Sequence, residues 1–173
     1  MSDCTVQLNK LLAAINGAGR ALERVERVEP RSKQFRHEAL QAMFHTTTCD
    51  AAQAIVRSGF DLSRARSHAF GVGVNLGRTT AQALMYVPPG AEPACTLVCL
   101  VAAGRTHANR SVADPDGGRD TVPVHMHPKP GFDSMTGARG AILVVADPRR
   151  VMPVFVVTHT KRKMESDLKT VKP

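Results

Sequence analysis

The chain has 173 residues, which is room for a single domain of ordinary size. Hydrophobic residues make up 43% and charged residues 22%, a globular composition that excludes a wholly disordered chain. Aromatic residues make up only 4%, with no Trp and one Tyr, which disfavours recognition of single-stranded nucleic acid by base stacking. The net charge of +8 favours anionic partners such as nucleotides, nucleic-acid backbones or an acidic protein surface.

The first half of the sequence carries mainly helical patterns. Apolar residues recur at helical spacing, glycines interrupt them near residue 18, and threonines stand where N-caps are needed. The elements predicted here are helices over 5–28 (broken at 16–19), 33–43, 49–58 (cap Thr48, end Gly59) and 80–86 (cap Thr79), and a strand over 69–76. We expect residues 1–30 to form an N-terminal helical extension that ends at Pro30.

The second half changes to short runs of Val, Ile, Leu and Phe between turn residues. These runs predict strands over 96–102, 141–145 and 154–158. Between them, residues 104–137 form a long polar stretch that is expected to be a loop, and residues 161–173 form a basic tail. Helices first and strands later favour the α+β fold class.

Neither a membrane segment nor a secretion signal is visible in the sequence. No apolar run approaches the roughly 18 residues of a membrane span, and the first residues lack the features of a signal peptide. The four cysteines, Cys4, Cys49, Cys95 and Cys99, include no Cys-x-x-Cys pair. We therefore expect buried thiols in a reduced compartment, and an intracellular protein of the nucleus or cytoplasm.

A set of short motifs in a fixed order extends over residues 44–158. The motifs are Phe44-His45-Thr46-Thr47, Ala54-Ile55, Gly59-Phe60-Asp61, Phe70-Gly71-Val72-Gly73-Val74-Asn75-Leu76, Tyr86, Pro130-Gly131-Phe132-Asp133-Ser134-Met135, Ile142-Leu143-Val144-Val145 and Val151-Met152-Pro153. Their order and spacing resemble the catalytic domain of the poly(ADP-ribose) polymerase family. No single motif is specific, and the resemblance rests on their shared order across about two-thirds of the chain.

The resemblance implies a fold, a domain and an activity. The fold would be the ADP-ribosyltransferase fold, with two small, mainly antiparallel sheets around an NAD cleft and short flanking helices. The catalytic domain would cover residues 31–160, followed by the tail at 161–173. The activity would be transfer of ADP-ribose from NAD to a protein side chain or a nucleic-acid end, with release of nicotinamide. The substrate NAD would be bound without a metal.

The resemblance also implies roles for individual residues. His45 would hydrogen-bond the adenosine ribose, Tyr86 would stack on the nicotinamide ring, and the backbone of Thr46 would bind the carboxamide. Thr47 and Gly73 would complete the NAD-binding set. This chemistry needs a rigid hold on the ring and both riboses, because positive charge develops at the ribose carbon as the glycosidic bond breaks.

One position defines the branch of the family, and three others depart from the family's pattern. Ile142 stands where the polymerising branch has a glutamate, so the resemblance implies transfer of single ADP-ribose units. Thr46 replaces a glycine, Asn75 replaces the tyrosine beside the nicotinamide ribose, and Ala83 replaces a serine that bonds the carboxamide. These three departures support a second hypothesis, a catalytically silent relative that binds protein or nucleic acid.

Alternative interpretations remain for several of these residues. His45 on its own could be a core histidine, and Gly71 and Gly73 could form a turn, a bulge or a phosphate-binding loop. The sequence His125-Met126-His127, with His107 nearby, is compatible with a metal site, although solvated loop histidines are the simpler interpretation. The run Lys161-Arg162-Lys163 fits a nuclear signal, a non-specific nucleic-acid contact or a solvated tail. A basic scaffold with an accidental motif match is a third hypothesis for the whole chain.

Overall fold

The computed structural model describes residues 2–29, 39–64, 70–109 and 125–162. Its helices are α1 Ser2–Gly17, α2 Cys49–Ser58 and α3 Thr80–Met85, with 3-10 turns η1 Leu62–Arg64, η2 Ala138–Gly140 and η3 Pro148–Arg150. Its strands are β1 Arg20–Arg27, β2 Leu40–Thr48, β3 Val74–Gly77, β4 Ala94–Ala102, β5 Thr106–Ala108, β6 Ser134–Gly137, β7 Ile142–Val145 and β8 Val151–Lys161. The α+β fold class is confirmed.

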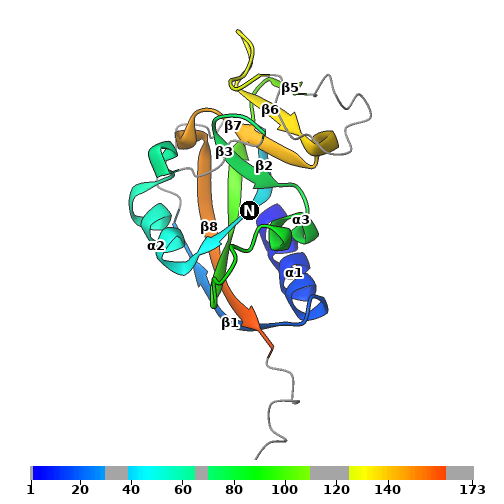
Figure 1. Cartoon of the computed structure of the whole chain (residues 1–173), viewed down its shortest axis with the longest axis vertical. Coiled ribbons are helices and arrows are strands. Elements are labelled where there is room, and N and C mark those ends of the chain that lie inside the picture. The colour runs from blue at the N-terminus through cyan, green and yellow to red at the C-terminus, as the bar shows by residue number, and fades with distance from the viewer. Residues whose placement is uncertain (1, 30–38, 65–69, 110–124, 163–173) are drawn as a thin grey trace, which may run out of the picture.

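The strands form one eight-stranded sheet in the order β1-β8-β4-β2-β3-β7-β6-β5. The prediction of two separate sheets is therefore wrong. The sheet is nevertheless almost divided at its middle, because β2 and β3 share a single paired position, Phe44 with Gly77. β2 pairs along its whole length with β4, and β3 pairs along its whole length with β7. Figure 1 shows the short strands β3, β6 and β7 above, running across the direction of the long strands β4 and β8.

Helices cover both faces of the long-stranded half of the sheet. α1 and α3 cover one face, where Leu11 and Ile15 of α1 pack against Phe44, Ala83, Val98 and Val157. α2 covers the other face, where Ile55 and Val56 pack against a core that includes Met43, Leu97 and Val156. Since successive strand residues point to opposite faces, Phe44 and Met43 join different clusters. The helical spacing of the first residues correctly predicts the buried stripe of α1.

Two of the predicted helices are confirmed together with their caps. The Thr48 hydroxyl accepts a hydrogen bond of 3.3 Å from the backbone N–H of Ala51, and α2 ends at Gly59, whose φ is 86°. Thr79 and Gln82 form a reciprocal capping box at the start of α3. The predicted strands over 96–102, 141–145 and 154–158 are confirmed as parts of β4, β7 and β8. Helix caps and short runs of β-branched residues were therefore sufficient to predict these five elements.

Four expectations about local structure are wrong. Residues 20–27 form β1 instead of the second half of a helix, because antiparallel pairing with β8 takes up this segment. The expected helix over 33–43 gives way to β2 from Leu40, while 30–38 lies outside the described residues. The strand expected over 69–76 begins only at Val74. The expected loop over 104–137 contains β5 and β6, which pair in parallel, and its residues 110–124 lie outside the description.

The expected basic tail begins inside the sheet. Lys161 is the last residue of β8, and its backbone N–H donates to Glu92 over 2.9 Å. The Arg162 guanidinium donates to the Asn16 side chain over 3.3 Å. Residues 163–173, including Lys163 of the predicted basic run, lie outside the described residues. Among the helices that the structure describes, none combines the length and the apolar character of a membrane span.

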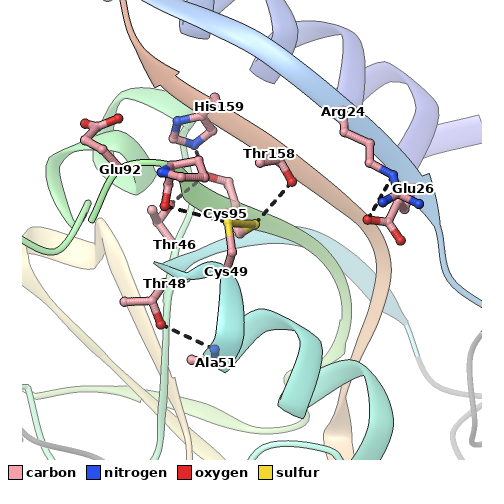
Figure 2. Close-up of a disulfide and its surroundings, with 12 residues drawn as sticks. Arg24, Glu26, Thr46, Thr48, Cys49, Ala51, Glu92, Cys95, Thr158 and His159 are labelled. Carbon is pink, nitrogen blue, oxygen red and sulfur yellow. Dashed lines mark hydrogen bonds and ion pairs between the residues drawn. A yellow bond between two sulfur atoms is a disulfide. The ribbon is translucent and has the colours of Figure 1, made fainter. Parts of the chain in front are cut away.

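The cysteines differ from the expectation of four thiols. Cys49 and Cys95 form a disulfide, with their Cα atoms 5.0 Å apart (Figure 2). The pairing of β2 with β4 brings them together, because Cys49 follows the last residue of β2 and Cys95 lies at the start of β4. Cys4 and Cys99 are buried and take no part in this disulfide. The expectation of a reduced compartment rested on four thiols and loses its basis.

Reduction of the disulfide should lower the stability of the fold. The bridge closes a loop over a sequence separation of 46 residues, and a loop of that size corresponds to about 4 kcal/mol of unfolded-state entropy. We expect the melting temperature to fall by on the order of 10 °C in excess reductant. The double variant Cys49→Ala/Cys95→Ala should melt at the lower temperature and ignore reductant, whereas Cys4→Ala should still respond. An unchanged melting temperature of the unmodified protein in reductant would contradict the bridge.

Candidate functional site

The candidate site lies where β2 and β3 separate. Past Phe44, the residues of β2 towards Thr48 have no partner in β3 among the described residues, so β2 presents an unpaired strand edge. Two cavities of about 330 and 1030 Å³ border this gap, and both are lined by His45, Thr46 and Asn75. Volumes of this order are typical of small-molecule sites.

The smaller cavity is largely apolar and is built by four elements. β2 contributes Phe44, His45 and Thr46, β3 contributes Asn75, Leu76 and Gly77, α3 and its C-cap contribute Ala83 and Tyr86, Ile142 starts β7, and Phe70 completes the lining. Six of the predicted site residues therefore lie around one cavity. Ala83 and Ile142 are buried, while Tyr86 is 48% exposed. The arrangement suits a flat, mainly apolar ring with few polar groups.

The larger cavity is more polar and lies beside α2 and the segment after it. Its lining includes the hydroxyl side chains of Thr47, Thr48, Ser58 and Ser63 and the charged side chains of Asp61 and Arg64. The predicted residues Thr47 and Gly73 line this cavity and not the smaller one. The eight predicted site residues are thus brought together from separate elements into two cavities that share three residues.

Gly73 has a structural reason as well as a place in the lining. A Cβ atom at this position would lie 2.6 Å from the Val145 backbone oxygen and 2.8 Å from a methyl group of Val144. Glycine therefore allows the chain to pass close to β7 before β3 begins. A Cβ atom at Gly71 would likewise collide with the Met135 side chain and would lie 3.1 Å from the Met126 carbonyl oxygen. A tight passage along the sheet accounts for both glycines.

His45 is partly buried and held from two sides. Its Nδ1 lies 3.0 Å from the Asn75 carbonyl oxygen, and its ring meets the Phe60 ring edge to face at 5.1 Å. Burial lowers the pKa of His45, opposed by the Asn75 hydrogen bond. Since a carbonyl only accepts, Nδ1 of the neutral ring carries the proton, and Nε2 is left as an acceptor. His45 can thus accept a hydrogen bond from a ligand hydroxyl.

A buried polar network, absent from the sequence predictions, connects the site to β1 at the edge of the sheet. The Thr46 and Thr96 hydroxyls are 2.9 Å apart, and Thr96 Oγ1 lies 2.9 Å from Nε2 of His159. The Arg20 Nε–H donates to His159 Nδ1 over 2.8 Å, and the guanidinium also pairs with Glu92 at 2.9 Å. Figure 2 labels His159, Glu92 and Thr46 of this network. The one sequence signal was a histidine inside the apolar run of β8.

The loop histidines gather at the outer edge of the sheet. The rings of His107 and His125 are 6.0 Å apart, and His107 also meets Phe132 edge to face at 5.1 Å. Nε2 of His107 accepts a hydrogen bond from the Lys129 backbone N–H. Within the described ranges, no three His, Cys, Asp or Glu side chains gather into a metal-binding group.

Comparison with known protein families and with curated proteins finds no match for the chain. The resemblance to the poly(ADP-ribose) polymerase family therefore stays a prediction made from the motifs. The geometry bears on it in one respect, because the residues that the resemblance selects lie around the same two cavities.

Stability should fall as the pH drops below neutrality. Burial and then the Arg20 charge lower the pKa of His159 from 6.5 to about 4. Between these two pKa values the unfolded chain binds more protons than the folded one. The free energy of unfolding therefore decreases as the pH is lowered, by about 3 kcal/mol for His159. The lowered pKa of His45 acts in the same direction.

Urea unfolding at several pH values between 4 and 7 measures this effect. His159→Gln removes the titrating ring and should flatten the pH dependence, even where it lowers the stability at pH 7. The dependence on urea concentration should stay equal in the two proteins, which shows that the same unfolding transition is compared. Equal pH slopes for the two proteins would contradict the buried, neutral state of His159.

Proposed function

We propose that this protein is an NAD-dependent ADP-ribosyltransferase that transfers a single ADP-ribose unit to an acceptor and releases nicotinamide. One observation carries the proposal. The eight residues selected from the motif resemblance line two cavities that share His45, Thr46 and Asn75. These residues come from β2, β3, α3 and β7 and the segments beside them, so their convergence does not follow from sequence neighbourhood.

The two cavities differ in polarity, as do the two ends of NAD, and this difference supports the assignment. The proposal assigns the nicotinamide ring to the smaller cavity, whose lining is mainly apolar and includes the half-exposed ring of Tyr86. It assigns the phosphates and the adenosine to the larger cavity, whose lining includes hydroxyls and the guanidinium of Arg64, which pairs with Asp61 at 3.5 Å. His45 lines both cavities, and its Nε2 would accept a hydrogen bond from a ribose hydroxyl.

The unpaired edge of β2 provides a further reason for an amide ligand. A strand edge offers backbone N–H donors and C=O acceptors in a row, which pair with an amide as they would with another strand. Thr46 lies on the part of β2 that β3 leaves unpaired. The nicotinamide carboxamide could thus be held by backbone groups at this edge.

The proposed reaction balances without a further co-reactant. The bond between the ribose C1′ and the nicotinamide nitrogen breaks, and its electron pair neutralises the pyridinium. An acceptor carboxylate oxygen then supplies the electron pair for the new bond to C1′. Ile142 is 3% exposed and brings no polar atom to the cavity, so the protein offers no carboxylate there to orient an acceptor hydroxyl. This favours an acceptor with its own carboxylate and single transfers; a nucleic-acid end is the alternative acceptor.

A second candidate function is a catalytically silent module that binds protein or nucleic acid. It is supported by the three departures, which all line the smaller cavity. Ala83 carries no hydroxyl, the Thr46 hydroxyl is bonded to Thr96, and Asn75 offers less contact area than a tyrosine. The net charge of +8 suits an anionic partner for such a module.

Incubation with radiolabelled NAD tests the enzyme proposal. We expect release of nicotinamide together with labelled protein, and a rise in melting temperature with NAD concentration. Tyr86→Ala should weaken NAD binding by about 2- to 12-fold, the value of one aromatic stacking contact. Met85→Ala is the matched control, because Met85 is the adjacent residue, is 81% exposed and does not line the cavity.

The outcomes separate the two candidate functions. No nicotinamide release, no labelling and no thermal shift at millimolar NAD would rule out the enzyme. Activity that appears only in the triple variant Thr46→Gly/Asn75→Tyr/Ala83→Ser would identify the natural protein as the silent relative.

A further inference from the structure

The direction of hydrogen bonding along the buried polar network is fixed at its charged end. A guanidinium only donates, so His159 Nδ1 must accept the hydrogen bond from Arg20. The neutral His159 ring then carries its proton on Nε2, which donates to the Thr96 hydroxyl. Thr96 is fully buried, and Thr46 is the one partner among the described residues that can take its hydroxyl proton, so we infer that Thr96 donates to Thr46. The proton of the Thr46 hydroxyl is thereby left over for a further partner.

The alternation of strand residues directs Thr46 and Asn75 to the face on which the smaller cavity opens. Thr46 lies two residues after Phe44, which packs against α1 and α3. Asn75 lies opposite Val144 in the pairing of β3 with β7, and Val144 clusters with Ile142 and Phe70, two residues of the cavity lining. Both polar side chains therefore belong to the cavity that Tyr86 and Ile142 border.

Asn75 supplies a group of the opposite kind. Its side-chain oxygen Oδ1 is buried and has no hydrogen-bond partner among the described residues. A buried acceptor without a partner costs about 1–3 kcal/mol, and a ligand N–H at that point would remove the cost. The mainly apolar lining of the cavity thus contains the Thr46 hydroxyl, whose proton can be donated to a ligand, and Asn75 Oδ1, which can accept a hydrogen bond from one.

We propose that the Thr46 hydroxyl and the Asn75 side-chain oxygen form a donor–acceptor pair for a primary carboxamide, with Thr96, His159 and Arg20 as positioning residues. The carboxamide oxygen accepts from the Thr46 hydroxyl, and one carboxamide N–H donates to Asn75 Oδ1. The second N–H and the second lone pair of the oxygen are left for the backbone edge of β2. The inference rests on the proposed function only in taking nicotinamide as the ligand. A carboxylate in the same place would set an oxygen against Asn75 Oδ1, so nicotinate is expected to bind more weakly than nicotinamide.

A ligand series tests the pair directly by calorimetry or ligand-observed NMR. Nicotinamide carries both groups, whereas 3-acetylpyridine carries the carbonyl oxygen without the N–H. Thr46→Val should weaken both ligands by about 2- to 12-fold, the value of one neutral hydrogen bond. Asn75→Leu, of similar shape, should weaken nicotinamide and leave 3-acetylpyridine unchanged. Thr46→Ser keeps the hydroxyl and should retain the affinity for both.

A second experiment tests the positioning residues. Thr96→Val removes the donor to Thr46 and should weaken nicotinamide as Thr46→Val does, while the double variant should be no weaker than either single variant. Thr96→Ser should restore the affinity, a result that general loss of structure would not give. Thr158→Val is the matched control, because Thr158 lies on β8 beside Cys95 and outside the network. His159→Leu removes the donor to Thr96 and should also weaken nicotinamide binding. The folding of this variant is checked by circular dichroism.

The results distinguish this inference from the proposed function. Failure of the unmodified protein to bind nicotinamide, or equal loss of both ligands in Asn75→Leu, overturns the pair. Additive losses in Thr46→Val/Thr96→Val overturn the positioning role. If nicotinamide binds with the expected variant pattern and NAD is not turned over, the pair stands and the transferase proposal fails. If NAD is turned over and Thr46→Val leaves nicotinamide affinity unchanged, the transferase stands and the pair fails.

Discussion

The single paired position between β2 and β3 is the constraint on which the site depends. Strands that pair along their whole length leave no room between them, and strands without any pairing would not belong to one sheet. Here Phe44 and Gly77 hold the two halves together at one point, and the strands separate beyond it. The cavities, the unpaired edge of β2 and the convergence of His45 with Asn75 all follow from this separation.

The buried polar network gives the same region a fixed polarity. The long-stranded half of the sheet is otherwise filled by apolar side chains, yet Thr96 and His159 are fully buried in it. Arg20 is 6% exposed, and its charge is met by Glu92 at the protein surface. A buried charge with both a carboxylate and an imidazole partner is well satisfied. The network therefore adds order to the sheet and ends at a residue of the site.

Sequence patterns predicted the local part of this structure and missed the non-local part. Thr48 and Thr79 correctly predicted where α2 and α3 begin, because an N-cap residue bonds to backbone groups within the next three residues. The apolar residues of the strand over 20–27 have helical spacing. Its strand conformation comes from pairing with β8, in which Arg27 lies opposite Phe155, far along the sequence. The disulfide and the polar network likewise depend on which strands become neighbours. The site residues were found because their motifs keep a fixed order, a signal that does not require the sheet order.

The two departures from the family pattern at Thr46 and Ala83 lie in the lining of the same cavity. The resemblance expects a hydroxyl on the α3 side of the smaller cavity, and Ala83 provides none. In the lining of the same cavity, Thr46 brings a hydroxyl to a position where the resemblance expects glycine, and that hydroxyl is the end of the polar network. By the resemblance, the hydroxyl that is absent at Ala83 has a counterpart in the Thr46 hydroxyl of the same lining. The two substitutions taken separately argue for a weakened site, and taken together they argue for a rearranged one.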